Sequence, residues 1–440
     1  MSEDNSHRIV IVGGGAGGLV LATQLGRKLG RKARARITLV DGSLTHLWKP
    51  LLHQVAAGSL NSYEDELNYF AHAKKNHYEF QVGRLENINR NEKTIQLGAI
   101  NDEKGNTIIE PRALPYDTLV LAIGSTSNDF GTPGAREHCI FLDSRAQAER
   151  FHKEFLQNYL QSHVVDATKQ PRQLNIAIVG AGATGVELAA ELHDASKTLS
   201  HYGVGDIKPE NVTITLIEAG KRILPALSEK VSHNAHQQLL KLGVNVMLGE
   251  QVTEVTRECL TTASGRRVES SLKVWSAGVK APDFLKDIAG LESNRINQLV
   301  VQSNLQTTRD PAIFAIGDCA GMVLNAGTKA EFRLPPRAQV AVQQAQQLSK
   351  SLVRQMNGGA LKDFNYRDYG SLVSMSRNAA YGNLMGKLTG NINVHGFIAR
   401  NMYISLYRMH QRSLFGTLSM LVLIAKDLLN RTTRPRLKLH

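Results

Sequence analysis

The sequence predicts an α/β protein with two Rossmann-like dinucleotide-binding domains, the second inserted in the first, and a C-terminal amphipathic helical membrane-binding region. Two observations predict the nucleotide domains. A G-x-G-x-x-G turn follows a short apolar strand twice, and each turn leads through a helix to a second strand that ends in an acid. The third observation is a tail that combines basic residues with apolar residues at helical spacing.

Length and composition are those of an ordinary globular enzyme. The chain has 440 residues, which suggests about three folding units. Hydrophobic residues make up 42% and charged residues 21%, which excludes a disordered chain, a collagen-like fibre and a disulfide scaffold. With 52 Lys and Arg against 39 Asp and Glu, the net charge is +13. Such a surplus favours an anionic partner: nucleic acid, acidic lipid or a phosphorylated ligand.

Cysteine usage and the absence of targeting patterns narrow the class further. Cys139, Cys259 and Cys319 are far apart in sequence, which excludes a C-x-x-C redox pair and a Cys/His metal site and favours a reducing environment. The N-terminus M-S-E-D-N-S-H lacks the pattern of a signal peptide. The longest apolar run, residues 414–425, covers about 18 Å as a helix, short of the ~30 Å hydrocarbon core. We expect no segment that spans a bilayer.

The first nucleotide unit begins at the N-terminus. A buried strand over 8–12 runs into Gly13, Gly15 and Gly18, a helix is expected to residue 29, and a strand over 37–40 ends at Asp41. In this motif the first glycine permits a tight turn, the second lets backbone N–H groups reach a pyrophosphate, and the third lets helix and strand pack closely. The acid is placed to accept hydrogen bonds from a ribose diol.

The second unit repeats the pattern later in the chain. A strand over 175–179 leads to Gly180, Gly182 and Gly185, a helix is expected through residue 192, and a strand over 212–217 ends at Glu218. A loop over 200–211 accounts for the longer spacing between the glycines and the acid. A lone G-x-G-x-x-G is also compatible with a plain strand-to-helix turn. Here strand, helix and acid agree twice, so we predict two dinucleotide sites.

The remaining elements are expected between and after these units. Strands are predicted over 80–82, 94–97, 107–109, 118–123, 244–248, 252–255, 272–275 and 313–316, and helices over 149–168 and from Pro335 to about Met356.

Two dinucleotide sites in one chain suggest a relay from an exchangeable nicotinamide to a tightly held flavin. The strand that ends in Ala315-Ile316-Gly317-Asp318 assigns the flavin to the first site, because Asp318 would meet the ribityl chain. The alternative is that Gly-Asp only closes a strand. Glu218 would repel a 2′-phosphate and favours NADH over NADPH, although the nearby Arg222 weakens this preference.

At this point the chain resembles the two-dinucleotide-binding-domain flavoproteins, and within them the bacterial type II NADH:quinone oxidoreductases. The resemblance covers nearly the whole chain. It is carried by the stretches I-V-I-V-G-G-G-A-G-G-L, H-L-W-K-P-L-L-H-Q-V-A-A-G-S-L, G-A-G-A-T-G-V-E-L-A-A-E-L, A-I-G-D-C-A, P-P-R-A-Q-V-A-V-Q-Q and Y-I-S-L-Y-R-M-H-Q. It implies one non-covalent FAD in the first site, NADH as co-substrate in the second, a membrane quinone as acceptor and no proton pumping.

The resemblance also implies roles for single residues. The segment 46–60 would line the flavin, with Lys49 as a contact, although it is equally a packed core segment. Gly124 and Gly278 are further expected cofactor contacts. Glu187 would lie by the nicotinamide and flavin rings; the alternative is a first-turn glutamate that complements the helix dipole.

Gln339 and Gln343, four residues apart on one helix face, would meet the quinone, since neutral amides donate to a carbonyl without a charge to desolvate. The alternative for this glutamine-rich helix is a solvated polar face. Disulfide reductases and sulfide:quinone oxidoreductases share the architecture but need paired cysteines beside the flavin, and Cys319 stands alone next to Asp318.

The tail is expected to bind an anionic lipid surface. From residue 395 to 440 it has eight basic residues against Asp427 alone, and Ile398, Met402, Leu406 and Met409 recur at helical spacing. A second helix is expected over 414–429, so the pair is typical of interfacial helices. The alternative is docking on the protein's own core or on a twin subunit, and a homodimer with both tails on one membrane is compatible with both readings.

These inferences give domain boundaries and a function. We predict residues 1–130 as the first part of the FAD domain, 131–300 as the NADH domain, 301–363 as the second FAD part with the quinone-side helix, and 364–440 as the membrane-association region. The predicted function is a peripheral enzyme on the cytoplasmic face of the bacterial inner membrane that oxidises NADH and reduces quinone. Two alternatives stay open: a soluble reductase of a small electron-carrier protein, and a non-catalytic redox sensor that binds NADH and FAD.

Overall fold

The structure is a computed structural model that describes residues 6–63, 66–163, 173–203, 211–325, 327–328, 331–375, 380–386, 390–433 and 437–438. The end of the helix predicted over 149–168, most of the loop predicted over 200–211 and the basic tail residues Arg434 and Arg436 lie outside these ranges. The chain forms two compact units. The first comprises residues 1–48, 66–126 and 279–366, and the second comprises 49–65, 127–278 and 367–440.

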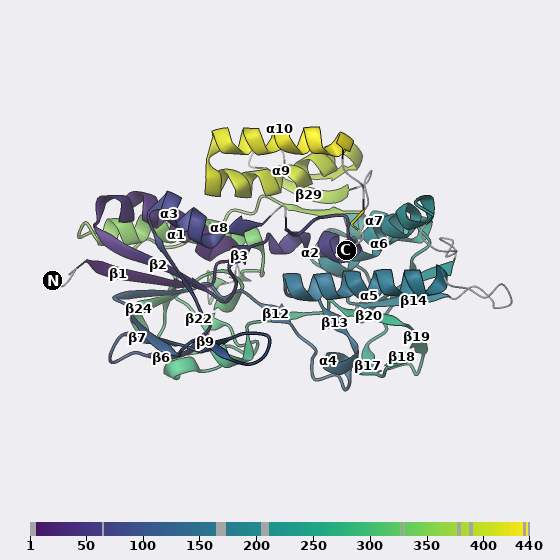
Figure 1. Ribbon diagram of the computed structural model, residues 1–440, viewed down its shortest axis with the longest axis horizontal. Helices are drawn as coiled ribbons and strands as arrows, with labels where there is room; N and C mark the ends of the chain where they lie inside the picture. The colour runs from purple at the N-terminus through teal and green to yellow at the C-terminus, as the bar shows by residue number, and fades with distance from the viewer. Residues whose placement is uncertain are drawn as a thin grey trace. The chain divides into compact units, whose positions relative to one another are not determined.

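The first unit contains a six-stranded sheet whose central strands are parallel (Figure 1). β1 pairs with β2 and with β11, in the register that aligns Ile11 with Leu39 and with Val120. These strands are apolar along most of their length because helices cover the sheet, and Ile11, Leu39 and Val120 are fully buried. The sheet order is β23 (Gln306–Thr307), β24 (Asp310–Ala315), β11 (Thr118–Leu121), β1 (His7–Val12), β2 (Ala35–Asp41) and β5 (Glu79–Val82).

Three helices belong to this unit. α1 (Ala16–Lys28) starts at the first glycine turn, and its last turn carries basic residues that favour the negative end of the helix dipole. α1 packs along α8 (Ala338–Gln355), and α3 (Tyr69–Asn76) packs beside α1. The smaller elements are β3 (Thr45–His46), β4 (Leu67–Asn68), β6 (Leu85–Asn89), β7 (Thr94–Leu97), β8 (Ile100–Asn101), β9 (Thr107–Ile109), β10 (Arg112–Pro115), β22 (Leu299–Val300), β25 (Ala320–Gly321), β26 (Val323–Leu324), β27 (Phe332–Arg333) and the short helix η6 (Gly317–Cys319).

An ion pair fastens the start of β1 to the start of β11. The Arg8 guanidinium donates Nη2–H to Asp117 Oδ1 at 2.8 Å and Nε–H to Oδ2 at 3.0 Å, and the Arg8 backbone N–H also donates to Oδ2. These bonds hold the pKa of Asp117 at about 2, below its ordinary value of 3.8. A carboxyl group with a lowered folded-state pKa stabilises the fold above its unfolded pKa, and this stability is lost as pH falls through the folded pKa.

We therefore expect Asp117→Asn to destabilise the first unit by about 1–2 kcal/mol at pH 7, a value reduced for the partial exposure of both side chains. The difference from the wild type should shrink between pH 4 and pH 2, where the native Asp117 also becomes protonated. Pulse-labelling hydrogen exchange of β1 peptides across a urea titration measures this difference. An equal difference at pH 7 and pH 2 would contradict the assignment.

The second unit repeats the architecture with a five-stranded parallel sheet (Figure 1). β14 is central and pairs with β15 on one side and β20 on the other. Val179, Ile217 and Trp275 from the ends of these strands lie in one hydrophobic cluster. The sheet order is β13 (Ile140–Phe141), β20 (Leu272–Trp275), β14 (Leu174–Val179), β15 (Val212–Glu218) and β16 (Asn245–Leu248).

The helix after the second glycine turn is longer than the sequence predicts. α6 runs from Ala183 to His201 rather than ending near residue 192. It continues because Ala195 and Leu199 are buried and no glycine or proline interrupts it. The other elements of this unit are η2 (Lys49–Leu51), α2 (Leu52–Ala57), α4 (Ala135–His138), α5 (Arg145–His163), α7 (Glu229–Lys241), β17 (Val252–Val255), β18 (Cys259–Thr262) and β19 (Arg267–Glu269).

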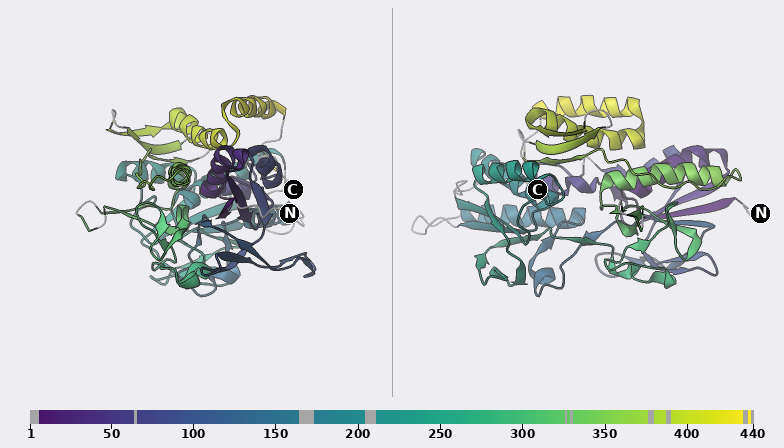
Figure 2. Two further views of the ribbon diagram at one scale, coloured as in Figure 1. Left: turned by 90° about the vertical axis from the view of Figure 1, so that its left-hand side faces the viewer. Right: turned by 180° about the vertical axis from the view of Figure 1, so that it is seen from behind.

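The C-terminal part of the second unit is a small sheet followed by a helical hairpin. β28 (Ser371–Ser374), β29 (Ala380–Gly386) and β30 (Gly390–His395) form an antiparallel sheet against which α9 (Gly396–Phe415) packs. Gly416 alone links α9 to α10 (Thr417–Thr433), which lies along α9 (Figure 2). Within the described residues, no helix is both long enough and apolar enough to cross a membrane.

The two nucleotide-type sheets confirm the predicted fold class, with residues 127–278 inserted between segments of the first unit. The compact units assign segments 49–65 and 279–300 differently from the predicted domains. Segment 49–65 joins the second unit because α2 packs against α5 and α6. The functional domain boundaries remain a prediction.

Candidate dinucleotide sites

The first glycine turn is shaped by backbone contacts. Gly13 has a φ of +105°, which an L side chain rarely adopts, and its N–H donates to the Val40 carbonyl at 2.7 Å. A side-chain carbon added at Gly18 would lie 1.9 Å from the Gly13 carbonyl oxygen, so helix and strand require glycine there. At Gly15 such a carbon would meet nothing within 4 Å. The turn therefore leaves open the position at which the motif admits a pyrophosphate.

Asp41 closes this turn from the end of β2. Its Oδ2 accepts the Gly14 N–H at 2.7 Å, and its Oδ1 accepts the Ser43 N–H at 2.8 Å. Burial raises the pKa of Asp41 above its ordinary value, and the two N–H groups oppose that rise. The carboxylate thus lies directly beside the glycine turn, as binding of a ribose diol requires.

The first glycine turn also contacts an aromatic residue, Tyr69, that the sequence does not predict as part of the site. The buried Tyr69 hydroxyl donates to the Gly14 carbonyl at 2.7 Å, and the Tyr69 ring stacks on Phe80 with centroids 4.8 Å apart. His46 lies beside Tyr69, and burial lowers the pKa of His46 to about 4, so its ring is neutral. Tyr69 is 55 residues from Gly14 in the chain, and no motif connects the two.

The end of β24 brings a second carboxylate to the first unit's candidate site. Asp318, in η6, accepts a hydrogen bond from the Ser125 hydroxyl at 2.8 Å. Ser125 directly follows Gly124 in the chain. A side-chain carbon at Gly124 would meet nothing within 4 Å. Gly124 and Asp318 follow β11 and β24, which are neighbouring parallel strands, so both lie at the carboxyl edge of the sheet. Ligands of open α/β sheets bind at this edge.

Gln344 on α8, which the sequence does not predict as a site residue, bonds this edge of the sheet. The buried Gln344 Oε1 accepts the Gly317 N–H at 2.7 Å. A side-chain carbon at Gly17 would lie 3.2 Å from the Ala341 carbonyl oxygen, so α1 and α8 approach closely. The predicted quinone-facing residues, Gln339 and Gln343, are half-buried on the same helix.

The second glycine turn repeats the first bond for bond. The Gly180 N–H donates to the Ile217 carbonyl at 2.8 Å, and a side-chain carbon at Gly185 would lie 2.0 Å from the Gly180 carbonyl oxygen. At Gly182 such a carbon would meet nothing within 4 Å. Glu218 accepts the Ala181 N–H at 2.8 Å and the Gly220 N–H at 2.7 Å. This arrangement matches that of Asp41 in the first turn.

Arg222 is occupied by its own loop. Its Nη1–H and Nη2–H groups donate to the Leu227 and Pro225 carbonyl oxygens, each at 2.8 Å. A guanidinium held by two carbonyl groups is less free to receive a 2′-phosphate at Glu218. Because Arg222 is held in this way, it weakens the predicted preference for NADH over NADPH less than its position in the sequence suggests.

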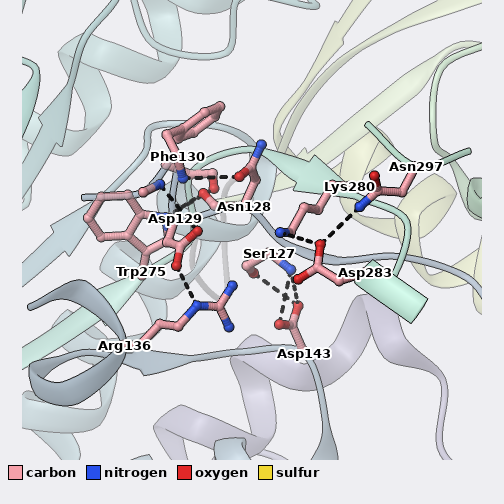
Figure 3. Close-up of polar contacts among 12 residues, drawn as sticks. Ser127, Asn128, Asp129, Phe130, Arg136, Asp143, Trp275, Lys280, Asp283 and Asn297 are labelled. Carbon is pink, nitrogen blue, oxygen red and sulfur yellow. Dashed lines mark hydrogen bonds and ion pairs between the residues drawn. The ribbon is translucent and has the colours of Figure 1, made fainter. Parts of the chain in front are cut away.

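The predicted contact Gly278 lies among aromatic residues. A side-chain carbon added there would lie 2.4 Å from the Phe130 ring. Trp275, at the end of β20, donates its indole N–H to the Asn128 carbonyl at 2.9 Å, and the Phe130 N–H is held by the Asn128 side chain at 3.0 Å (Figure 3). Asp129 in this loop forms an ion pair with Arg136 on α4. The loop over 128–130 is therefore fixed against the carboxyl end of the second sheet.

Lys49 and Asp143 lie close together in the second unit. Lys49 Nζ is 3.9 Å from Asp143 Oδ1, and the Lys49 side chain is half exposed. Asp143 also accepts the Ser127 backbone N–H and hydroxyl, both at 2.9 Å to Oδ1 (Figure 3).

Glu187 is buried in α6 with 6% of its surface exposed, and it lies past the first turn of the helix, so the alternative of a first-turn glutamate that complements the helix dipole is wrong. Its Oε1 accepts the Ser374 N–H at 3.0 Å, and its Oε2 lies 3.4 Å from His53 Nδ1. His53, on α2, was not among the predicted site residues. The predicted segment 46–60 contains it, but its side chain carries no motif that connects it to Glu187.

The three cysteines are buried and free. The Cys319 thiol donates to the Leu121 and Ile316 carbonyl oxygens, each at 3.4 Å. Burial raises the pKa of Cys319 to about 11, so the thiol is protonated and a weak nucleophile.

The chain is similar to a known protein family and to individual known proteins. The pyridine nucleotide-disulphide oxidoreductase family model matches residues 7–345. The type II NADH:quinone oxidoreductase of Haemophilus influenzae is 45% identical over 449 residues, covering 98% of this chain and 99% of that protein. The type II NADH:quinone oxidoreductase Ndh of Mycobacterium tuberculosis is 28% identical, covering 91% of this chain and 83% of that protein.

Solved structures share the fold at lower identity. NDH2 from Plasmodium falciparum, solved in complex with NADH, has a TM-score of 0.78 at 18% identity and covers 95% of this chain and 98% of that chain. The sulfide:quinone oxidoreductase of Aquifex aeolicus has a TM-score of 0.71 at 16% identity and covers 94% and 93%. At such identities the likeness shows the fold alone.

Proposed function

This chain belongs to the type II NADH:quinone oxidoreductase family, and we propose that its first glycine turn holds one non-covalent FAD and its second holds NADH. The family membership agrees with the resemblance seen in the sequence. The protein is a membrane-associated NADH dehydrogenase that uses flavin and NADH, reduces quinone and does not pump protons. A flavin held by these residues would supply the hydride and electron-transfer chemistry that connects NADH to quinone.

The observation that carries this assignment is the duplicated turn. Gly15 and Gly182 are open at the same position of the motif, and each turn is closed by an acid, Asp41 or Glu218. A nucleotide pyrophosphate fits next to a glycine whose side-chain position is empty and whose following helix presents its positive end. The residues present therefore fit two dinucleotides.

The flavin is assigned to the first unit. Asp318 and Gly124 lie at the carboxyl edge of the sheet that contains β1, the strand that leads into Gly13. Asp318 would accept from the ribityl chain, and Lys49 would contact the flavin from segment 46–60. Glu187 would lie by the rings, with its carboxylate fixed by Ser374.

NADH is assigned to the second unit, with Glu218 as the residue that selects against NADPH. We expect Glu218→Gln to raise the ratio of kcat/KM for NADPH to that for NADH at least about tenfold, because a carboxylate repels a 2′-phosphate and an amide does not. Steady-state rates with each nucleotide give the ratio. Asp41→Asn, in the matching position of the first turn, serves as control: flavin retention should fall and the ratio should stay constant. If the NADPH-to-NADH ratio changed in Asp41→Asn and not in Glu218→Gln, the assignment of NADH to the second unit would be refuted.

The quinone would meet α8 at Gln339 and Gln343. These amides are half-buried and four residues apart, so they present two neutral donors on one helix face. Gln344, which bonds Gly317, fixes the helix to the strand end that carries Asp318. The proposed quinone face and the proposed flavin edge thus belong to the same unit and are joined by a hydrogen bond.

The membrane contact is assigned to α9 and α10. On α10, Leu418 and Leu429 are 77% and 72% exposed, with Leu421 and Val422 exposed on the same helix face. Asp427, the tail's one acid, bonds Arg408 at 2.5 Å. Basic residues beside an apolar helix face are typical of interfacial helices on anionic lipid. We place this contact on the cytoplasmic face of the bacterial inner membrane, with a homodimer that presents both hairpins to it.

Turnover with NADH and a short-chain quinone tests the function against its two alternatives. A quinone reductase turns over at about once per second or faster, as enzymes typically do, whereas a redox sensor falls far below that rate. A reductase of a small carrier protein would keep full activity with its carrier after removal of residues 396–440. The proposed function requires that this deletion abolish activity with membrane-embedded quinone while activity with soluble quinone persists.

A further inference from the structure

His53 and Glu187 form a buried contact inside the second unit. His53 lies on α2 and is 2% exposed, and Glu187 lies on α6 and is 6% exposed. His53 Nδ1 is 3.4 Å from Glu187 Oε2, while Glu187 Oε1 accepts the Ser374 N–H at 3.0 Å. The carboxylate is therefore approached by polar groups from α2 and from β28. Burying a carboxylate without such groups is costly.

The protonation state of His53 follows from its surroundings. Burial lowers the pKa of His53 to about 4, so the imidazole is neutral at pH 7. Among the described residues, His53 Nε2 has no hydrogen-bond partner. A proton on Nε2 would be a buried donor without an acceptor, whereas a proton on Nδ1 faces the Glu187 carboxylate. His53 also makes a hydrogen bond to the Pro50 backbone, which opposes the lowering of its pKa and likewise favours the proton on Nδ1. The Nδ1–H tautomer is the one that satisfies the site.

Three other ionisable groups on the helices that pack against α2 have hydrogen-bond partners away from His53. On α5, Glu149 accepts the Ser62 hydroxyl at 2.6 Å, and His152 Nε2 lies 2.9 Å from the Lys438 carbonyl. On α6, Glu191 accepts the Ser59 hydroxyl at 2.8 Å. Glu187 is the carboxylate that faces the His53 ring.

We propose that His53 is a positioning residue for Glu187: its neutral imidazole donates Nδ1–H to the carboxylate and fixes the orientation in which Glu187 meets the reacting nicotinamide. This inference rests on the proposed function, which places Glu187 beside the rings. The 3.4 Å separation is long for a hydrogen bond, and such contacts in ligand-free sites shorten when the substrate binds. Small displacements of an orienting group lower the rate of the chemical step strongly.

Two substitutions at residue 53 separate positioning from packing. His53→Leu fills the space without a donor and is expected to lower kcat for NADH oxidation about tenfold or more, with KM for NADH changed less than about threefold. His53→Asn places an amide nitrogen where Nδ1 lies and is expected to keep kcat within about threefold of the wild type. His152→Leu removes another buried histidine, whose Nε2 lies 2.9 Å from the Lys438 carbonyl, and should leave kcat unchanged.

Nuclear magnetic resonance of ¹⁵N-histidine-labelled enzyme gives a readout that does not depend on turnover. One imidazole, absent from His53→Asn, should show the Nδ1–H tautomer and should not titrate between pH 5.5 and 8.5, since its pKa is about 4. Glu187→Gln should shift that signal, and His152→Leu should not.

The outcomes divide cleanly. An Nε2–H tautomer, titration near neutral pH, or a His53→Leu enzyme with normal kcat overturns the proposal. If His53→Leu does not fold, the His53→Asn kinetics and the tautomer decide. A wild type that does not reduce quinone with NADH refutes the proposed function, whereas the tautomer and its response to Glu187→Gln still test the contact itself.

Discussion

Gly15→Ala is expected to give a folded but colourless protein. Gly15 has extended backbone angles (φ −68°, ψ −165°) that alanine adopts without strain, and its added carbon meets no protein atom within 4 Å. The methyl group would instead meet the pyrophosphate of FAD. Overpacking of this kind costs about 1–3 kcal/mol, which corresponds to about tenfold to a hundredfold weaker binding. Flavin absorbance after gel filtration and the circular dichroism spectrum measure the two effects.

Gly182→Ala is the matched variant in the second turn. Its backbone is equally extended (φ −70°, ψ −175°) and its side-chain position is equally open. This protein should keep its flavin colour, and its KM for NADH should rise at least about tenfold. Each variant serves as the control for the other. Loss of flavin from Gly182→Ala, with flavin retained in Gly15→Ala, would reverse the assignment of the two sites.

The second large effect is expected on the membrane contact. Replacing Leu418, Leu421 and Val422 by serine removes three exposed apolar side chains from one face of α10. Full burial of such a side chain contributes about 1.5–3 kcal/mol, so even partial insertion of all three predicts a loss of about a hundredfold or more in partitioning to vesicles. Flotation with vesicles that contain anionic lipid measures this loss.

Two features keep that experiment interpretable. The replaced residues are exposed, so the fold and the rate with a soluble quinone should stay close to those of the wild type. A matched variant carries three serines at exposed apolar positions outside the tail: Tyr63, Ile108 and Phe130. It should float with vesicles as the wild type does. Equal flotation of the α10 variant would contradict a lipid contact through α10.

The nucleotide turns could be predicted from sequence because their requirements are local. Gly13, Gly18 and Asp41 are fixed by a strand, a turn and a helix that follow one another in the chain, and the structure gives each the predicted neighbour. The assignment of these residues to particular cofactors stays a proposal.

The contacts that join distant segments could not be predicted. Tyr69 under Gly14 and His53 beside Glu187 depend on how helices pack, and no local pattern encodes either contact. The sheet of β28, β29 and β30 was also missed: β28 has only four residues, and β29 and β30 contain glycines, which are depleted in strands. α10 begins at Thr417 rather than at residue 414 because Gly416 ends α9.

The proposed path of electrons from NADH through one flavin to quinone is tested most directly by an anaerobic titration of enzyme purified from washed membranes. Addition of NADH in an amount equal to the bound flavin should bleach the visible absorbance fully, and a short-chain quinone added next should restore it. Absorbance that ignores NADH, or that stays bleached in the presence of quinone, would contradict the relay.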